Sequence, residues 1–184
     1  MKGKNIILGV TGSIACYKSC DIANELTKKG HKVNVIMTEN GMEFVTPLTF
    51  QTLTKRKVYT GMFKEYEPSS VKHISLAKEC DLFVIAPATA NIIAKLPSGI
   101  ADDMLSSVAL AYGNKPMVIC PAMNTAMYEN VHTQKNIEVL KDNGVQFIGP
   151  KSSLLACGDV GKGSLESTDV ILEKLDIILE NING

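Results

Sequence analysis

The sequence predicts an α/β protein built on a doubly wound parallel sheet, a three-layer Rossmann-like or flavodoxin-like fold with helices on both sides. Short runs rich in Val and Ile alternate with amphipathic stretches along the whole chain. Such runs, apolar on both faces, are typical of buried parallel strands, and strand–helix alternation with right-handed crossovers gives a doubly wound sheet. With 184 residues and no linker or internal repeat, residues 1–184 are expected to form a single domain.

Five runs are expected to be strands, because each is short, apolar and followed by turn residues: 5–10, 32–37, 81–88, 116–122 and 145–150. Five stretches between and after them are expected to be helices: 14–29, 73–79, 101–112, 131–142 and 168–182. The last of these has the clearest apolar face, since Ile171, Leu175 and Ile178 recur at helical spacing.

Composition excludes several classes of protein. The 19 Lys and Arg residues balance the 19 Asp and Glu residues, so neither a nucleic-acid partner nor a charged interaction tail is indicated. No apolar run is long enough to span a membrane, and the first residues lack a signal-peptide pattern. The five cysteines are odd in number and match no metal-site spacing, so we expect free thiols, no metal and a cytoplasmic protein.

Ligands of such a sheet bind at the carboxyl ends of the strands. The first strand is followed by a turn containing Gly12 and Ser13, where a helix is expected to begin. Exposed amides at a helix amino end bind phosphate, and a serine hydroxyl adds a donor. The turn does not match G-x-G-x-x-G, and Glu39 after the second strand keeps a dinucleotide such as NAD only as a minor alternative.

The strand ending near residue 88 is followed by a small, polar turn formed by Ala88, Thr89, Ala90 and Asn91. Small residues let a flat ring or a phosphate approach the backbone, although an ordinary capped helix start has the same composition. The neighbouring acids at 102 and 103 are either a catalytic pair or, more commonly, the start of a helix.

Two further residues have both a structural and a functional interpretation. Asn124, flanked by Met123 and Met127, is either a helix cap or a ligand for a substrate carboxylate, and methionines at this spacing are usually core filler. His73 opens a predicted helix, where a histidine is usually structural, and its functional interpretation is a general acid or base.

The stretch LLACGDVGKG, residues 154–163, places Cys157 among small residues and three glycines. Glycines favour bent backbone, so we expect a mobile loop with neither helix nor strand. From the residues alone, an incidental loop cysteine is favoured over one that meets a ligand.

Taken together, the segments GSIA, HISLAKECDLFVIAPATANIIAK, GIADDML, PAMNTAMY and ACGDVGKG occur in the order and spacing of one family. The chain resembles the homo-oligomeric flavin-containing cysteine decarboxylases from Asn5 to about Glu166. The resemblance implies an FMN cofactor held by ten residues: Gly12, Ser13, Ile14, Ala15, Thr38, Ala88, Thr89, Ala90, Asn91 and Ala122. It also implies a homotrimer, or a dodecamer of trimers, with FMN near a subunit interface and a small-molecule substrate.

The same resemblance implies roles in a decarboxylation that passes through a thioaldehyde and an ene-thiolate. His73 is the implied acid/base residue of the early steps, and Cys157 is the implied late proton donor, carried by a loop at 151–166 that closes over the site. Substrate contacts are implied for five residues: Asn124, Met123, Leu154, Leu155 and Ala156. Relatives that act on peptide C-terminal cysteines stop at the ene-thiol, so Cys157 favours the coenzyme A branch of the family.

Three departures accompany the resemblance. Tyr128 stands where the family usually has Trp, and the usual Gly-x-Gly-Arg-Met is replaced by a segment with Lys162 and Ser164. Lys and Arg are not equivalent at bidentate sites, so loop closure and phosphate contacts are expected to differ in detail. Many bacterial relatives also carry a second, fused domain that ligates cysteine to phosphopantothenate. We therefore expect this chain to be either a stand-alone decarboxylase or a piece of such a fusion.

Three alternatives to a decarboxylase of the coenzyme A branch are a flavin prenyltransferase, a peptide-cysteine decarboxylase and a phosphatase-binding regulatory subunit.

Overall fold

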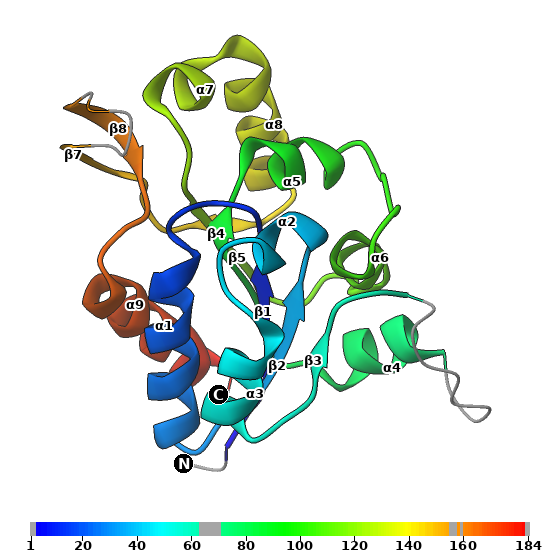
Figure 1. The fold of residues 1–184 in the computed structure, drawn as a ribbon. Helices are drawn as coiled ribbons and strands as arrows, with labels where there is room; N and C mark the ends of the chain where they lie inside the picture. Colours follow the sequence, from blue (N-terminus) through cyan, green and yellow to red (C-terminus); the bar gives the residue numbers. More distant parts are fainter. Residues whose placement is uncertain (1–2, 63–70, 155–157, 159, 183–184) are drawn as a thin grey trace.

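A six-stranded parallel sheet forms the centre of the protein (Figure 1). The structure is a computed structural model that describes residues 3–62, 71–154, 158 and 160–182. The strands run in the order β3-β2-β1-β4-β5-β6. Their bounds are β1 (Asn5–Val10), β2 (Lys32–Met37), β3 (Val58–Tyr59), β4 (Leu82–Ala88), β5 (Met117–Pro121) and β6 (Gln146–Phe147). Because the order reverses between β1 and β4, ligands are expected at the carboxyl ends of these two neighbours.

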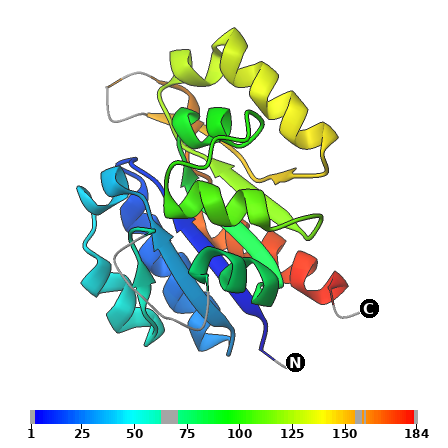
Figure 2. The ribbon, with the colours of Figure 1, turned by 90° about the vertical axis from the view of Figure 1, so that its right-hand side faces the viewer.

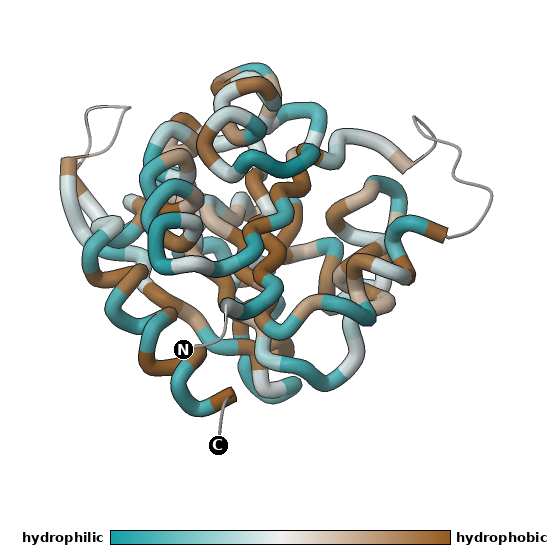
Figure 3. Tube along the Cα trace, turned by 90° about the horizontal axis from the view of Figure 1, so that it is seen from below, coloured by the Kyte–Doolittle hydropathy of each residue, from teal (hydrophilic) through white to brown (hydrophobic). Residues whose placement is uncertain are grey.

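Helices cover both faces of the sheet, as the two perpendicular views show (Figures 1 and 2). Successive strand residues point to opposite faces, so Ile6 and Leu8 of β1 pack toward α1 and α9, whereas Ile7 packs toward α4 and α6. Apolar positions gather along the central strands and polar ones on the outer helices (Figure 3). The helices are α1 (Cys16–Lys28), α2 (Glu39–Met42), α3 (Pro47–Thr54), α4 (Lys72–Glu79), α5 (Ala90–Lys95), α6 (Met104–Ala111), α7 (Thr125–Glu129), α8 (Val131–Asp142) and α9 (Thr168–Asn181).

The predicted fold class is confirmed, and all five predicted strands are present. The last one is shorter than predicted, because Gly149 adopts a φ of 79° and Pro150 has no N–H to donate to the ladder. The first helix starts at Cys16 rather than residue 14, since a turn occupies the residues before it. None of the helices in the described part of the chain is long and apolar enough to cross a membrane.

The segment 154–163 was predicted to lack strands, and this prediction is wrong where the structure describes it. Residues Lys151–Leu154 (β7) and Val160–Ser164 (β8) pair as an antiparallel hairpin. A Cβ at Gly163 would lie 2.2 Å from the Met123 carbonyl oxygen, and the Met123 N–H donates to the Gly163 carbonyl at 2.9 Å. Here a glycine serves close approach between two backbones rather than a bend. The predicted loop residues 155–157 and 159 lie outside the described residues.

Candidate functional site

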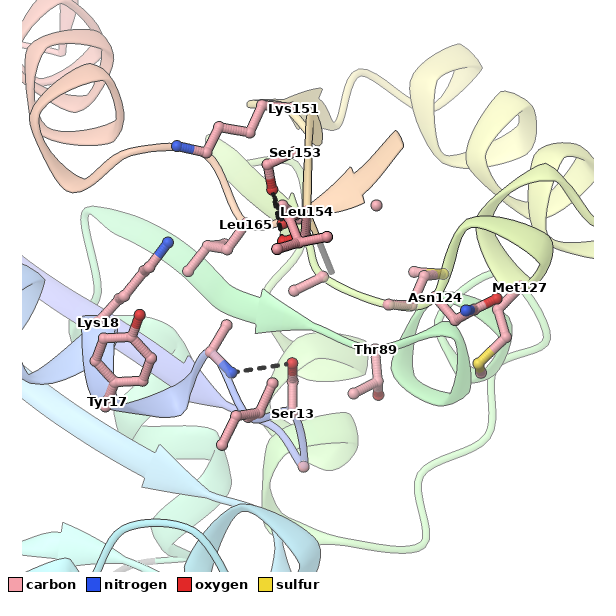
Figure 4. A pocket seen from close by; sticks show the side chains of 17 residues that line it. Ser13, Tyr17, Lys18, Thr89, Asn124, Met127, Lys151, Ser153, Leu154 and Leu165 are labelled. Atoms are coloured by element: carbon pink, nitrogen blue, oxygen red, sulfur yellow. Dashed lines mark hydrogen bonds between the residues drawn. The ribbon is translucent and has the colours of Figure 1, made fainter. Parts of the chain in front are cut away.

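A cavity of about 580 Å³ lies at the carboxyl ends of β1, β4 and β5, beside the β7–β8 hairpin (Figure 4). Its size falls in the range of small-molecule and cofactor sites. Seventeen of the described residues line it: Gly12, Ser13, Ile14, Ala15, Tyr17, Lys18, Thr89, Ala122, Met123, Asn124, Met127, Lys151, Ser153, Leu154, Gly163, Ser164 and Leu165.

The loop after β1 supplies the floor of the cavity. The Ser13 N–H donates to the Thr11 carbonyl at 2.8 Å, and the Ser13 hydroxyl accepts from the Ala15 N–H at 3.3 Å. Among the described residues, the N–H groups of Gly12 and Ile14 have no hydrogen-bond acceptor, although both residues line the cavity. Unsatisfied amides at the amino end of a 13-residue helix suit an anionic group such as a phosphate.

Thr11, which sequence analysis did not single out, joins the loops after β1 and β4. Its side chain is buried, and its hydroxyl donates to the Pro87 carbonyl at 2.7 Å while accepting from the Thr89 N–H at 3.1 Å. Its own carbonyl accepts from the Cys16 thiol at 2.8 Å. A single residue thus holds the two loops that form one side of the cavity, a role visible only once β1 and β4 are known to be neighbours.

Six of the ten residues expected to hold the cofactor line the cavity: Gly12, Ser13, Ile14, Ala15, Thr89 and Ala122. The other four are placed elsewhere. Ala88 is fully buried, and its carbonyl accepts from the Ala122 N–H at 2.9 Å as part of the sheet. Ala90 and Asn91 form the first turn of α5, and the Thr38 hydroxyl caps α2.

The residues after β5 form the opposite wall. The Asn124 Oδ1 accepts from the Ala126 N–H at 2.8 Å, so this residue caps α7 while also lining the cavity. The cap and the ligand interpretations are therefore compatible at this position. Met127 has 50% of its surface exposed at the cavity rim, so the expectation that it fills the core is wrong.

His73 lies in the first turn of α4, half-buried, and is not among the described residues that line the cavity. Helix α4 packs with α6 on the face of the sheet away from α1 and the hairpin (Figure 1). The Lys115 ammonium donates to the carbonyls of Ala77, Lys78 and Cys80 at 2.7–2.9 Å, which satisfies and neutralises the C-terminus of α4. Lys115 therefore fixes the helix that carries His73.

The acids at 102 and 103 start a helix, as their commoner interpretation predicted. The Asp103 carboxylate caps α6 by accepting from the Ser106 N–H at 2.8 Å. Lys95 pairs with Asp102 at 2.6 Å and with Asp103 at 3.2 Å. The hydrogen bond from Lys95 holds the pKa of Asp102 below its usual range, and neither acid lines the cavity.

One end of the cavity is basic and hydroxylated, a feature that sequence analysis missed. Lys18 and Lys151 extend toward the same space, and the Ser153 and Ser164 hydroxyls are hydrogen-bonded to each other at 2.5 Å (Figure 4). Burial lowers the pKa of Lys18, and the positive charge of Lys151 lowers it further, while Glu166 acts in the opposite direction. Helical spacing could have indicated Lys18, which lies one turn after Ile14, whereas Lys151 is positioned only by the hairpin.

The sequence is similar to that of known flavoproteins. A family model described as flavoprotein matches residues 1–180. The probable phosphopantothenoylcysteine decarboxylase of Streptococcus mutans serotype c is 51% identical over 174 residues, which cover 94% of this chain and 97% of that protein. The coenzyme A biosynthesis bifunctional protein CoaBC of Bacillus subtilis strain 168 is 48% identical over 173 residues, which are 94% of this chain but only 42% of that longer protein.

Solved structures agree with the sequence comparison. A mutant PPC decarboxylase complexed with pantothenoylaminoethenethiol superposes with a TM-score of 0.87 at 26% identity, covering 97% of this chain and 100% of the other. The FMN binding protein AtHal3 superposes with a TM-score of 0.85 at 27% identity, covering 98% of each chain.

Proposed function

Because the chain belongs to the flavoprotein family, we infer that it is an FMN-dependent phosphopantothenoylcysteine decarboxylase, a cytoplasmic carboxy-lyase that forms 4′-phosphopantetheine for coenzyme A biosynthesis. The observation that carries this proposal is the 51% identity to a probable phosphopantothenoylcysteine decarboxylase over nearly the whole of both chains. The cavity supports it, since residues expected to hold flavin and residues expected to hold substrate line the same space.

The residues of the cavity fit FMN. Small side chains at Ala15 and Ala122 leave room for a flat ring near the strand ends. The unpaired amides of Gly12 and Ile14, with the Ser13 hydroxyl, would hold the phosphate. Bound FMN would supply reversible two-electron redox chemistry next to the cysteinyl part of the substrate.

The chain's own residues would bind the substrate and move protons. Asn124 would orient the carboxylate that is lost, because its side chain lines the cavity and is itself held by the helix cap. His73 would act as the acid or base of the early steps. Cys157, which lies outside the described residues, would donate the last proton to the product. Leu154, the last residue of β7, lines the cavity, and contact with substrate is expected there.

We place the complete site between subunits of a homotrimer or a dodecamer of trimers. His73 sits on α4, away from the cavity of its own chain, so a second copy would have to bring its own His73 to that cavity. This is tested by coexpressing His73→Asn with Asn124→Asp, a variant that keeps a capping oxygen. If neighbours share a site, the mixed oligomer should recover about a quarter of the wild-type activity, whereas no recovery would place both residues in one chain's site.

Mass spectrometry of phosphopantothenoylcysteine incubated with the purified protein tests the reaction itself. Loss of CO2 alone is the expected result. Loss of CO2 together with two hydrogens would indicate oxidation without the return of the hydride, as in decarboxylases that stop at the ene-thiol. An unchanged substrate with bound flavin would contradict the proposal and favour a flavin prenyltransferase or a binding protein.

A further inference from the structure

The cavity has opposite chemical character at its two ends. Lys18 and Lys151 lie at one end, and Thr89 and Asn124 lie at the other (Figure 4). Lys18 projects from the first turn of α1, and Lys151 begins β7 directly opposite Ser164 of β8. Two elements far apart in sequence therefore direct ammonium groups toward one space.

These two charges have no direct ion-pair partner among the described residues. Neither ammonium is within ion-pair distance of a carboxylate in the described part of the chain, whereas Lys29 and Lys95 are paired. Glu166 is the acid that acts on Lys18, and its Oε1 accepts a hydrogen bond from the Ser167 N–H at 2.9 Å. Burial is the main cause of the lowered pKa of Lys18, and repulsion from Lys151 adds to it. A bound anion would relieve this repulsion between the two lysines.

The Ser153 and Ser164 hydroxyls lie at the same end, and each can donate to a ligand by exchanging its present hydrogen bond. Both residues line the cavity, and their oxygens lie 2.5 Å apart. Two ammonium groups and two hydroxyls on neighbouring elements match a phosphate monoester, which carries close to two negative charges and three acceptor oxygens at neutral pH.

We propose that Lys18 and Lys151, with the Ser153–Ser164 hydroxyl pair, form a subsite for the 4′-phosphate of the substrate and so determine the preference for a phosphorylated substrate. This rests on the proposed function, whose substrate has a carboxylate at one end and a phosphate at the other. Asn124 at one end of the cavity and the lysines at the other complement these two groups.

FMN is the other source of a phosphate monoester at this site. The loop after β1 already offers unpaired amides to the cofactor phosphate, at Gly12 and Ile14. Lys151 instead belongs to the same strand as Leu154, a residue expected to contact substrate. These placements favour the substrate phosphate as the group that the lysines bind.

The test compares decarboxylation of 4′-phosphopantothenoylcysteine with that of pantothenoylcysteine by the flavin-loaded protein. We expect the wild type to prefer the phosphorylated compound about 100-fold in kcat/KM, Lys18→Gln and Lys151→Gln each to lower this ratio about tenfold, and the double variant to remove it. Lys28→Gln is the matched control, since it removes the same charge about 15 Å away along α1 and should keep the wild-type ratio.

A second readout requires no turnover. Calorimetric binding of 4′-phosphopantetheine and pantetheine should show the same loss of phosphate preference in the lysine variants. Their FMN content and FMN affinity should match those of the wild type. An unchanged preference, or a loss of FMN affinity with the substrate preference retained, would overturn the assignment. Equal wild-type rates on both compounds would contradict the subsite alone, whereas no CO2 release from either would contradict the proposed function on which the subsite rests.

Discussion

Replacing Thr11 with valine is predicted to loosen the loops that form the candidate site. Valine has the shape of threonine but lacks the hydroxyl, so the Pro87 carbonyl and the Thr89 N–H both lose the partners they have at 2.7 and 3.1 Å. Thr11 has only 2% of its surface exposed, so water would not easily replace the lost hydroxyl.

The expected cost follows from these two contacts. An unsatisfied buried polar group costs about 1–3 kcal/mol, so two of them should lower the free energy of unfolding by about 2–6 kcal/mol. Thr11→Ser is the matched control, because it keeps the hydroxyl and removes one methyl group, at a cost of about 1 kcal/mol. Urea denaturation at one fixed protein concentration measures both variants, and FMN retention reports on the loops of the site.

The comparison between the two variants tests whether the Thr11 hydroxyl holds the two loops together. We expect Thr11→Val to lose more stability and to retain less FMN than Thr11→Ser. If the valine variant is as stable as the serine variant and binds FMN as tightly, the hydroxyl does not tie the two loops together, and the role assigned to Thr11 is wrong.

Four further changes test other parts of the site. Cys157→Ser should still release CO2 but accumulate the oxidised ene-thiol by mass spectrometry; full conversion to 4′-phosphopantetheine would rule out the proton-donor role. His73→Asn should abolish CO2 release, and a rate near that of the wild type would remove His73 from the mechanism. Gly161→Ala should slow product formation, because its Cβ would lie 2.3 Å from the Thr125 hydroxyl and displace the hairpin; wild-type kinetics would show that the hairpin position does not matter. Lys115→Met should lower the free energy of unfolding by about 1–3 kcal/mol in urea, since three carbonyls lose their donor, and an unchanged midpoint would contradict that role.

The sheet could be predicted because buried parallel strands appear in sequence as continuous apolar runs bounded by turns. β4 is the clearest case, with all seven residues buried. β3 has only two residues, too few for any pattern, and so it was missed. β7 and β8 were missed for a different reason, since neither has a continuous apolar run and β8 contains two glycines that in isolation suggest a loop.

Residues that line the cavity were predictable where they follow a strand closely. Ser13, Thr89 and Asn124 come directly or shortly after β1, β4 and β5, and parallel strands bring their carboxyl ends to one edge. Lys18 and Lys151 could not be found in this way, because a helix turn and a hairpin direct their side chains into the cavity. All the expected cofactor and substrate contacts, and the roles of His73 and Cys157, stay predictions.

The β7–β8 hairpin contacts both ends of the cavity, so a side chain at one of its glycines would affect the position of residues at both ends. Gly163 of β8 is hydrogen-bonded to Met123, the neighbour of Asn124. Ser164, the next residue, pairs with Lys151 at the basic end. On the proposed function, the same strand would set both the position of the carboxylate ligand and that of the phosphate subsite. A side chain at Gly163 would push β8 away from the Met123 backbone, and would therefore disturb binding at both ends of the substrate together rather than at either one alone.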